Sequence, residues 1–79
     1  MKTYNGHRSW NAWNVSLWLN NDYGMYHYIV DTVKSLGIRK AVKVIFRDLE
    51  GQKTPDGAIY NRLSIKLAIE GMEIEQEGE

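Results

Sequence analysis

The sequence predicts a single all-α domain over residues 1–79, a small bundle of about four short helices with an acidic end (about 73–79) that frays. Three observations lead to this prediction. Apolar residues recur at helical spacing in several segments, and residues that cap or end helices stand between those segments. A chain of 79 residues is also long enough for only one core.

The first helix is expected to begin after Ser9, whose hydroxyl can accept a bond from a free backbone N–H, and to end at residues 21–22. Three tryptophans recur along it at helical spacing: Trp10, Trp13 and Trp18. Since a chain without cysteine must build its core from bulky side chains, we expect all three in the core. The alternative is an aromatic platform for bases or a partner. The intervening asparagines are expected to bond to loop backbone and organise residues 4–6.

The second helix is expected from about Tyr23 to Leu36, with Gly37 as a left-handed residue that ends it. Its apolar stripe has the i, i+3, i+4, i+7 spacing of an amphipathic helix. The stripe consists of Tyr26, Ile29, Val30 and Val33. We therefore expect Tyr26, Ile29 and Val33 in the core.

The remaining two segments are compatible with helix or strand. Residues 38–50 place five apolar positions on one helical face, yet residues 42–46 would also suit a buried strand. Residues 63–69 alternate as a strand would, but Ser64 could cap a helix that runs to about residue 76. Two strands would give an α+β fold with an isolated hairpin, which is barely stable alone. Helix is preferred for both segments, and α+β is the alternative.

Composition narrows the class of protein. The chain has no cysteine, one proline and no apolar run near the length of a membrane span, so we expect a folded, cytoplasmic protein without disulfides. The first residues lack the apolar stretch of a secretory signal. Stability in so small a chain could also come from self-association, so a monomer and a homodimer are both compatible with the sequence.

Charge is segregated along the chain although its formal sum is zero. Residues 1–53 carry eight basic and four acidic side chains, whereas residues 54–79 carry two basic and six acidic ones. Four basic residues form a ridge opposite the apolar face of the third helix: Arg39, Lys40, Lys43 and Arg47. Acidic residues gather near the other end, among them Glu70, Glu73 and Glu75. Both sets are candidate partner-binding surfaces, and the alternative for each is a solvated polar face.

No pattern of residues indicates catalysis. The serines lack a nucleophile-elbow setting, and the scattered glycines form no phosphate loop. His7 and His27 are the only imidazoles; His27 with Asp31 has i, i+4 spacing, but no third ligand stands at a recognisable distance. We expect a protein that is not an enzyme and that has no catalytic residue, metal or cofactor.

Several motifs together resemble a known family. They are Tyr4-Asn5-Gly6, Trp13-Asn14-Val15, Leu17-Trp18-Leu19, Asn21-Asp22, Gly24-Met25-Tyr26 and, more weakly, Thr54-Pro55-Asp56-Gly57. This combination is similar to that of short, uncharacterised proteins found in phages, prophages and plasmids. Met25 departs from that family's usual leucine. The resemblance covers about 25 residues well, and its spaced tryptophans make it specific.

The resemblance implies a mobile-element origin and a partner. Small phage proteins without catalytic residues often inhibit host defence, as anti-CRISPR proteins do. We therefore expect protein–protein contact with a host complex, such as a CRISPR–Cas effector subunit, in the cytoplasm of the bacterial host. The basic ridge or the acidic residues would make that contact. A nucleic-acid-associated accessory protein that uses the basic ridge is the alternative, and zero net charge weighs against it.

Overall fold

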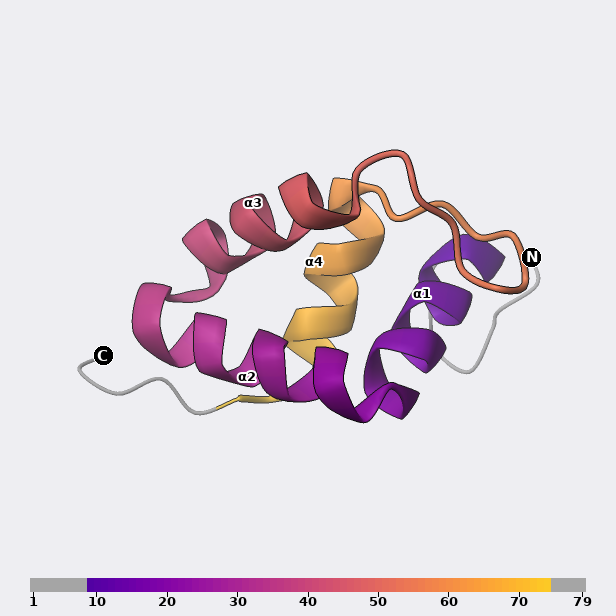
Figure 1. Ribbon diagram of the computed structural model, residues 1–79. Coiled ribbons are helices and arrows are strands. Elements are labelled where there is room, and N and C mark those ends of the chain that lie inside the picture. The colour runs from indigo at the N-terminus through magenta and orange to yellow at the C-terminus, as the bar shows by residue number, and fades with distance from the viewer. Residues whose placement is uncertain (1–8, 75–79) are drawn as a thin grey trace.

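The computed structural model describes residues 9–74 of the chain. Four helices account for most of this part: α1 (Trp10–Asn21), α2 (Tyr23–Leu36), α3 (Ile38–Leu49) and α4 (Arg62–Gly71) (Figure 1). The all-α prediction is confirmed, and residues 42–46 and 63–69, the alternative strands, lie in helices. Within residues 9–74, β pairing is limited to one bridge between Lys53 and Ile59.

The helices form a closed ring of contacts. α1 packs on α2, α2 on α3, and α3 on α4, and α4 returns to make its most extensive contact with α1. A loop at residues 50–61 joins α3 to α4 and passes beside α1 (Figure 1). In the described part of the chain, no helix is long and apolar enough to cross a membrane.

The first two helices begin where their capping residues predict. The Ser9 hydroxyl accepts a hydrogen bond from the Ala12 N–H at 3.1 Å, which satisfies a donor that the first turn of α1 leaves free. The Asp22 carboxylate accepts from the Met25 N–H at 3.0 Å and does the same for α2. Local sequence signals therefore set both starts.

Gly37 both ends α2 and begins α3. Its N–H donates to the Val33 carbonyl, while its own carbonyl accepts from the Ala41 N–H. Its φ is 82°, as the predicted left-handed terminator requires, but its ψ of 165° is extended. The extended ψ arises because the chain must leave one helix and enter the next within a single residue. Glycine tolerates this conformation because it has no Cβ.

The predicted boundaries of the last helix are wrong at its start. Asn61, not Ser64, caps α4, because its side-chain oxygen accepts from the Ser64 N–H at 2.8 Å. The earlier start places Ser64 inside the helix, where its buried hydroxyl accepts from the Asn11 amide. The helix also ends at Gly71, before the predicted residue 76, and glycine favours helix poorly. Residues 75 and 76 lie outside the described part.

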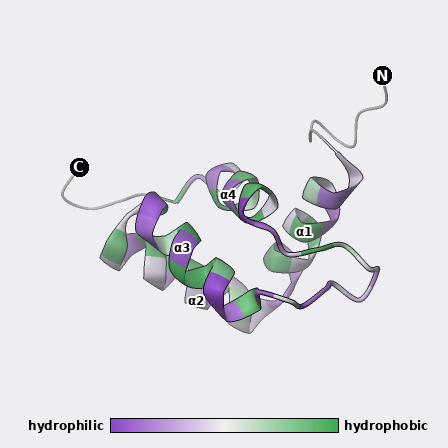
Figure 2. Ribbon diagram, turned by 90° about the horizontal axis from the view of Figure 1, so that it is seen from above, coloured by the Kyte–Doolittle hydropathy of each residue, from purple (hydrophilic) through white to green (hydrophobic). Residues whose placement is uncertain are grey.

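The hydrophobic core draws one stripe from each helix. Figure 2 shows hydrophobic and hydrophilic residues alternating along α3, as this arrangement requires. Ile29 and Val33 are fully buried, as predicted, whereas Tyr26 is half-buried. Within residues 9–74, the buried residues of the core cluster are Val15, Leu19, Ile29, Val33, Ala41, Ile45, Leu49, Ala58, Ile65, Ala68 and Ile69.

The prediction that the tryptophans build the core is wrong. Trp10 is 39% exposed, Trp13 and Trp18 are half-buried, and none of the three belongs to the core cluster. The buried stripe of α1 is formed by smaller residues: Ala12, Val15 and Leu19, joined by Asn14. Small side chains on this face allow the helices to approach closely, and the indoles therefore lie at the edges of the interface.

Candidate partner-binding groove

Two asparagines of α1 hold the loop at residues 50–61 in place. The Asn11 amide donates to the Ile59 carbonyl at 2.8 Å and accepts from the Ile59 N–H at 2.7 Å. The same Nδ2 donates to the Ser64 hydroxyl at 2.8 Å. Asn11 thus satisfies the backbone of Ile59 as a neighbouring strand would, and it ties both the loop and α4 to α1.

Asn14 forms the more buried contacts between α1 and the loop. It is 1% exposed, and its side-chain oxygen accepts from the Thr54 hydroxyl at 2.6 Å while its nitrogen donates to Asp56 Oδ2 at 2.9 Å. Trp18 Nε1 donates to the same Asp56 oxygen at 3.0 Å. The hydrogen bonds from Asn14 and Trp18 hold the pKa of the Asp56 carboxyl below its usual value. We call Asn11, Asn14, Trp18, Thr54 and Asp56 the loop clasp.

The loop clasp stabilises the fold by joining α1 to the loop at residues 50–61. The asparagines do bond to loop residues, as predicted, but the loop is residues 50–61; the predicted target, residues 4–6, lies outside the described part. Among residues 9–74, no buried side-chain polar atom lacks a hydrogen-bond partner. The clasp also brings together two segments that carried the family resemblance, around Trp13-Asn14-Val15 and Thr54-Pro55-Asp56-Gly57.

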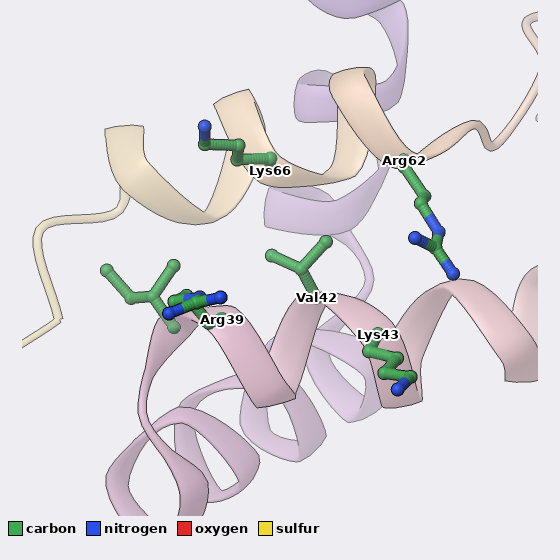
Figure 3. Close-up of a pocket in the computed structure, with 6 residues that line it drawn as sticks. Arg39, Val42, Lys43, Arg62 and Lys66 are labelled. Atoms are coloured by element: carbon green, nitrogen blue, oxygen red, sulfur yellow. The ribbon is translucent and has the colours of Figure 1, made fainter.

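The basic residues of α3 lie on the surface, and two of them border a groove. All four residues of the predicted ridge are exposed. Arg39 and Lys43 of α3, together with Arg62 and Lys66 of α4, line a groove of about 390 Å³ (Figure 3). Ile38 and Val42 complete its lining. We call this space between the two helices the α3–α4 groove.

A second hollow adjoins the groove at the corner between α2 and α3. It has a volume of about 640 Å³ and shares Ile38, Arg39 and Lys43 with the α3–α4 groove. Lys40 and Leu36 line it as well, and Leu36 is 44% exposed. Arg47, the last residue of the predicted ridge, lines neither space.

The groove carries concentrated positive charge. Within residues 9–74, none of its four cations forms an ion pair with a carboxylate. The Arg62 guanidinium lies 5.3 Å from the centroid of the Phe46 ring, a cation–π contact that holds it between the helices. Figure 3 shows Arg62 extending from α4 toward α3 and Val42 pointing from α3 toward α4.

Sequence reasoning missed half of these cations. Arg62 and Lys66 have the same i, i+4 spacing as Arg39 and Lys43, which was the available signal. Nothing local shows that α4 lies beside α3, so the two pairs could not be joined. Of the predicted acidic residues, Glu70 and Glu73 are exposed near the end of α4 and line neither space, and Glu75 lies outside the described part.

His27 is part of an aromatic group on α2. Its ring makes edge contacts with Tyr23 at 4.3 Å and Tyr26 at 6.1 Å between centroids. In the part of the chain that the structure describes, no three His, Cys, Asp or Glu side chains come together as a metal site. His7 lies outside that part.

Comparison with known proteins places the chain in a family. A model described as a family of unknown function, DUF7249, matches residues 1–79, so the chain belongs to that family. No curated protein and no solved structure matches the chain.

Proposed function

We propose that this member of the DUF7249 family is a non-enzymatic binding protein whose α3–α4 groove docks onto an acidic surface of another protein. The observation that carries the proposal is the gathering of four cations from two helices around one groove. They have no carboxylate partner within residues 9–74. Unpaired like charges in close proximity repel one another, and an anionic partner relieves that repulsion.

The position of the aromatic residues favours a protein over a nucleic acid as the partner. Single-stranded nucleic acids are held by cations together with aromatic side chains on which bases stack. Among residues 9–74, no aromatic residue lines the groove, and the Phe46 ring close to it already contacts Arg62. The three tryptophans are on α1. A formal net charge of zero also disfavours a general nucleic-acid coat.

The resemblance to proteins of phages, prophages and plasmids supplies a biological setting for this proposal. In that setting the chain is an inhibitor of the anti-CRISPR type, acting in the cytoplasm of a bacterial host. It covers a surface of a defence complex, and a CRISPR–Cas effector subunit is the proposed partner. The small size of the chain and the absence of a catalytic motif from its sequence support inhibition by contact.

A charge-reversal experiment tests the proposal. The tagged chain is expected to co-purify with the effector complex from a CRISPR-positive host and to restore plaque formation by a targeted phage. Lys43→Glu combined with Lys66→Glu is expected to abolish both effects, because it makes one side chain on each wall of the groove acidic. The matched control is Lys34→Glu with Lys53→Glu, which makes the same change in net charge at exposed positions outside the groove.

Three results would contradict the proposal. They are wild-type behaviour of the groove variant, equal loss in the control variant, and co-purification of nucleic acid without effector protein. Each can be read from the same purification by mass spectrometry and nuclease treatment.

A further inference from the structure

The two walls of the α3–α4 groove are cationic, but its floor is apolar. Ile38 and Val42 are half-buried and pack against the hydrophobic core, and they lie in the same lining as the four cations. The adjoining hollow extends this character, because it adds the exposed side chain of Leu36. An apolar strip therefore runs between basic residues at the surface.

Resting on the proposed function, we infer that the ligand of this groove is an amphipathic acidic segment of a protein. Its apolar side chain is seated on Ile38 and Val42, and its carboxylates flank that anchor. A partner recognised by charge alone would make no use of the apolar residues in the lining. A segment with both chemistries covers the floor and neutralises the walls together.

The spacing of the cations fits such a segment. Arg39 and Lys43 are one helical turn apart on α3, and Arg62 and Lys66 are one turn apart on α4. Residues at this separation have Cβ atoms about 5–6 Å apart. Carboxylates one turn apart on a ligand helix share that distance, and alternate side chains of an extended ligand are about 6.6 Å apart. Either backbone conformation can therefore present acids to the two cations of one wall.

The apolar anchor is the part that gives affinity. Exposed ion pairs contribute little to net binding, because water and salt screen them and long side chains lose freedom. Burial of an apolar side chain removes surface from water and is not screened. The cations thus determine which segments are accepted and how fast they arrive, and the floor determines how long they stay.

Three fluorescein-labelled probes separate these contributions when they are titrated against the full chain. The first is an acidic peptide with two leucines one helical turn apart and glutamates on both sides. The second is the same peptide with serine in place of both leucines, and the third is an oligothymidylate of equal charge. We expect the leucine peptide to bind at least about tenfold more tightly than the serine peptide. The oligothymidylate is expected to bind more weakly than the leucine peptide.

Single-residue variants test whether the preference for the leucine peptide arises in the groove. Val42→Ser is expected to remove the preference for the leucine peptide over the serine peptide. Val44→Ser is the matched control, because Val44 is also a half-buried valine of α3 but lines neither hollow. Helix content by circular dichroism checks folding, and Val42→Thr, nearly identical in shape, replaces the serine variant if that variant unfolds.

The outcomes distinguish this inference from the proposed function. Equal affinity for the two peptides, or an unchanged preference in the folded Val42 variant, overturns the inference and leaves charge-based docking intact. Absence of binding by both peptides at low salt overturns the proposed function as well. Tighter binding of the oligothymidylate than of either peptide overturns both and assigns the groove to nucleic acid.

Discussion

At the scale of single residues, the most constrained side chain is the amide of Asn14. It is 1% exposed, and each of its two polar atoms has a partner in the loop at residues 50–61. A buried amide with both partners contributes modestly to stability, whereas removal of one member leaves the others unsatisfied. Loss of the Asn14 side chain is therefore expected to cost more than the net contribution of its own hydrogen bonds.

Asn14→Ala is expected to lower the free energy of unfolding by about 1–3 kcal/mol, because the buried Thr54 hydroxyl loses the oxygen that accepts its hydrogen bond. Urea denaturation followed by circular dichroism measures the loss. Asn20→Ala is the control on the same helix, since Asn20 is exposed and its side chain bonds, within residues 9–74, only to Ser16. Similar losses of unfolding free energy in the two variants would show that the hydrogen bonds of the clasp contribute no more than the exchange of asparagine for alanine in a helix.

The Asp56 carboxyl predicts a pH dependence. Its pKa is lowered in the folded protein, first by the bond from Asn14 and then by the bond from Trp18, so folding favours the ionised form. The resulting stabilisation is present above the ordinary carboxyl pKa of 3.8 and is lost as the pH falls through the lowered value.

Asp56→Asn should therefore show a smaller decrease in melting temperature than the wild type between pH 5 and pH 2. Thermal melts at a series of pH values measure the difference. Asp31→Asn removes a carboxyl that has no hydrogen-bond partner within residues 9–74, and it should follow the wild type. A wild-type acid slope in Asp56→Asn would argue against a role for these two bonds.

The tryptophans show what residue type alone cannot determine. Their spacing correctly indicated a helix, but the same periodicity is compatible with any rotation of that helix about its axis. Ala12, Val15 and Leu19 define an equally regular stripe. Which stripe faces inward depends on how closely α4 approaches α1, and the sequence of α1 alone contains no information about that distance.

At the scale of elements, the single-residue junction at Gly37 fixes how α2 leads into α3. Its φ of 82° and ψ of 165° lie in a region that side chains with a Cβ rarely occupy. Tyr28, one helix upstream, donates a hydrogen bond from its hydroxyl to Asp48 of α3, and this contact raises the pKa of the tyrosine. The junction and this bond together hold the two helices in one arrangement.

Gly37→Ala is expected to destabilise the protein by about 1–3 kcal/mol, because a residue with a Cβ is strained at the φ of 82° and ψ of 165° of this junction. Gly24→Ala is a matched comparison and should stabilise by about 0.5–1 kcal/mol, since alanine favours helix more than glycine does. A Cβ at Gly24 would meet its nearest neighbour, the Asp22 carboxylate, at 3.7 Å, which is ordinary contact. Urea denaturation of the two variants gives both values, and a loss in Gly24→Ala would refute the comparison.

Element boundaries could be predicted where one strong local signal was present. Ser9 and Gly37 each stand alone at their junctions and were placed correctly. Asn61 and Ser64 are both good capping residues three positions apart, so local sequence does not choose between them. Asn61 is the cap because the resulting helix directs Ser64 toward Asn11, a contact 53 residues distant along the chain.

At the scale of the whole molecule, the α3–α4 groove is a product of tertiary structure. Each helix contributes a pair of cations with a spacing visible in the sequence, but their juxtaposition follows from the packing of α4 between α1 and α3. Sequence analysis could therefore identify Arg39 and Lys43 and could not add Arg62 and Lys66. The same limit applies to the apolar floor, which exists only where the two helices meet.

The closed ring of contacts has a consequence for how fast the protein folds. The bonds of the loop clasp join residues 38 to 53 positions apart, so a long segment must be brought together before they form. Helical proteins dominated by local contacts fold fastest, and this chain should be slower than its helix content suggests. If the clasp forms after the rate-limiting step, Asn14→Ala will accelerate unfolding and leave the refolding rate nearly unchanged. Stopped-flow measurements of the refolding and unfolding rates of this variant would then show that the clasp forms late in folding and slows unfolding of the native state.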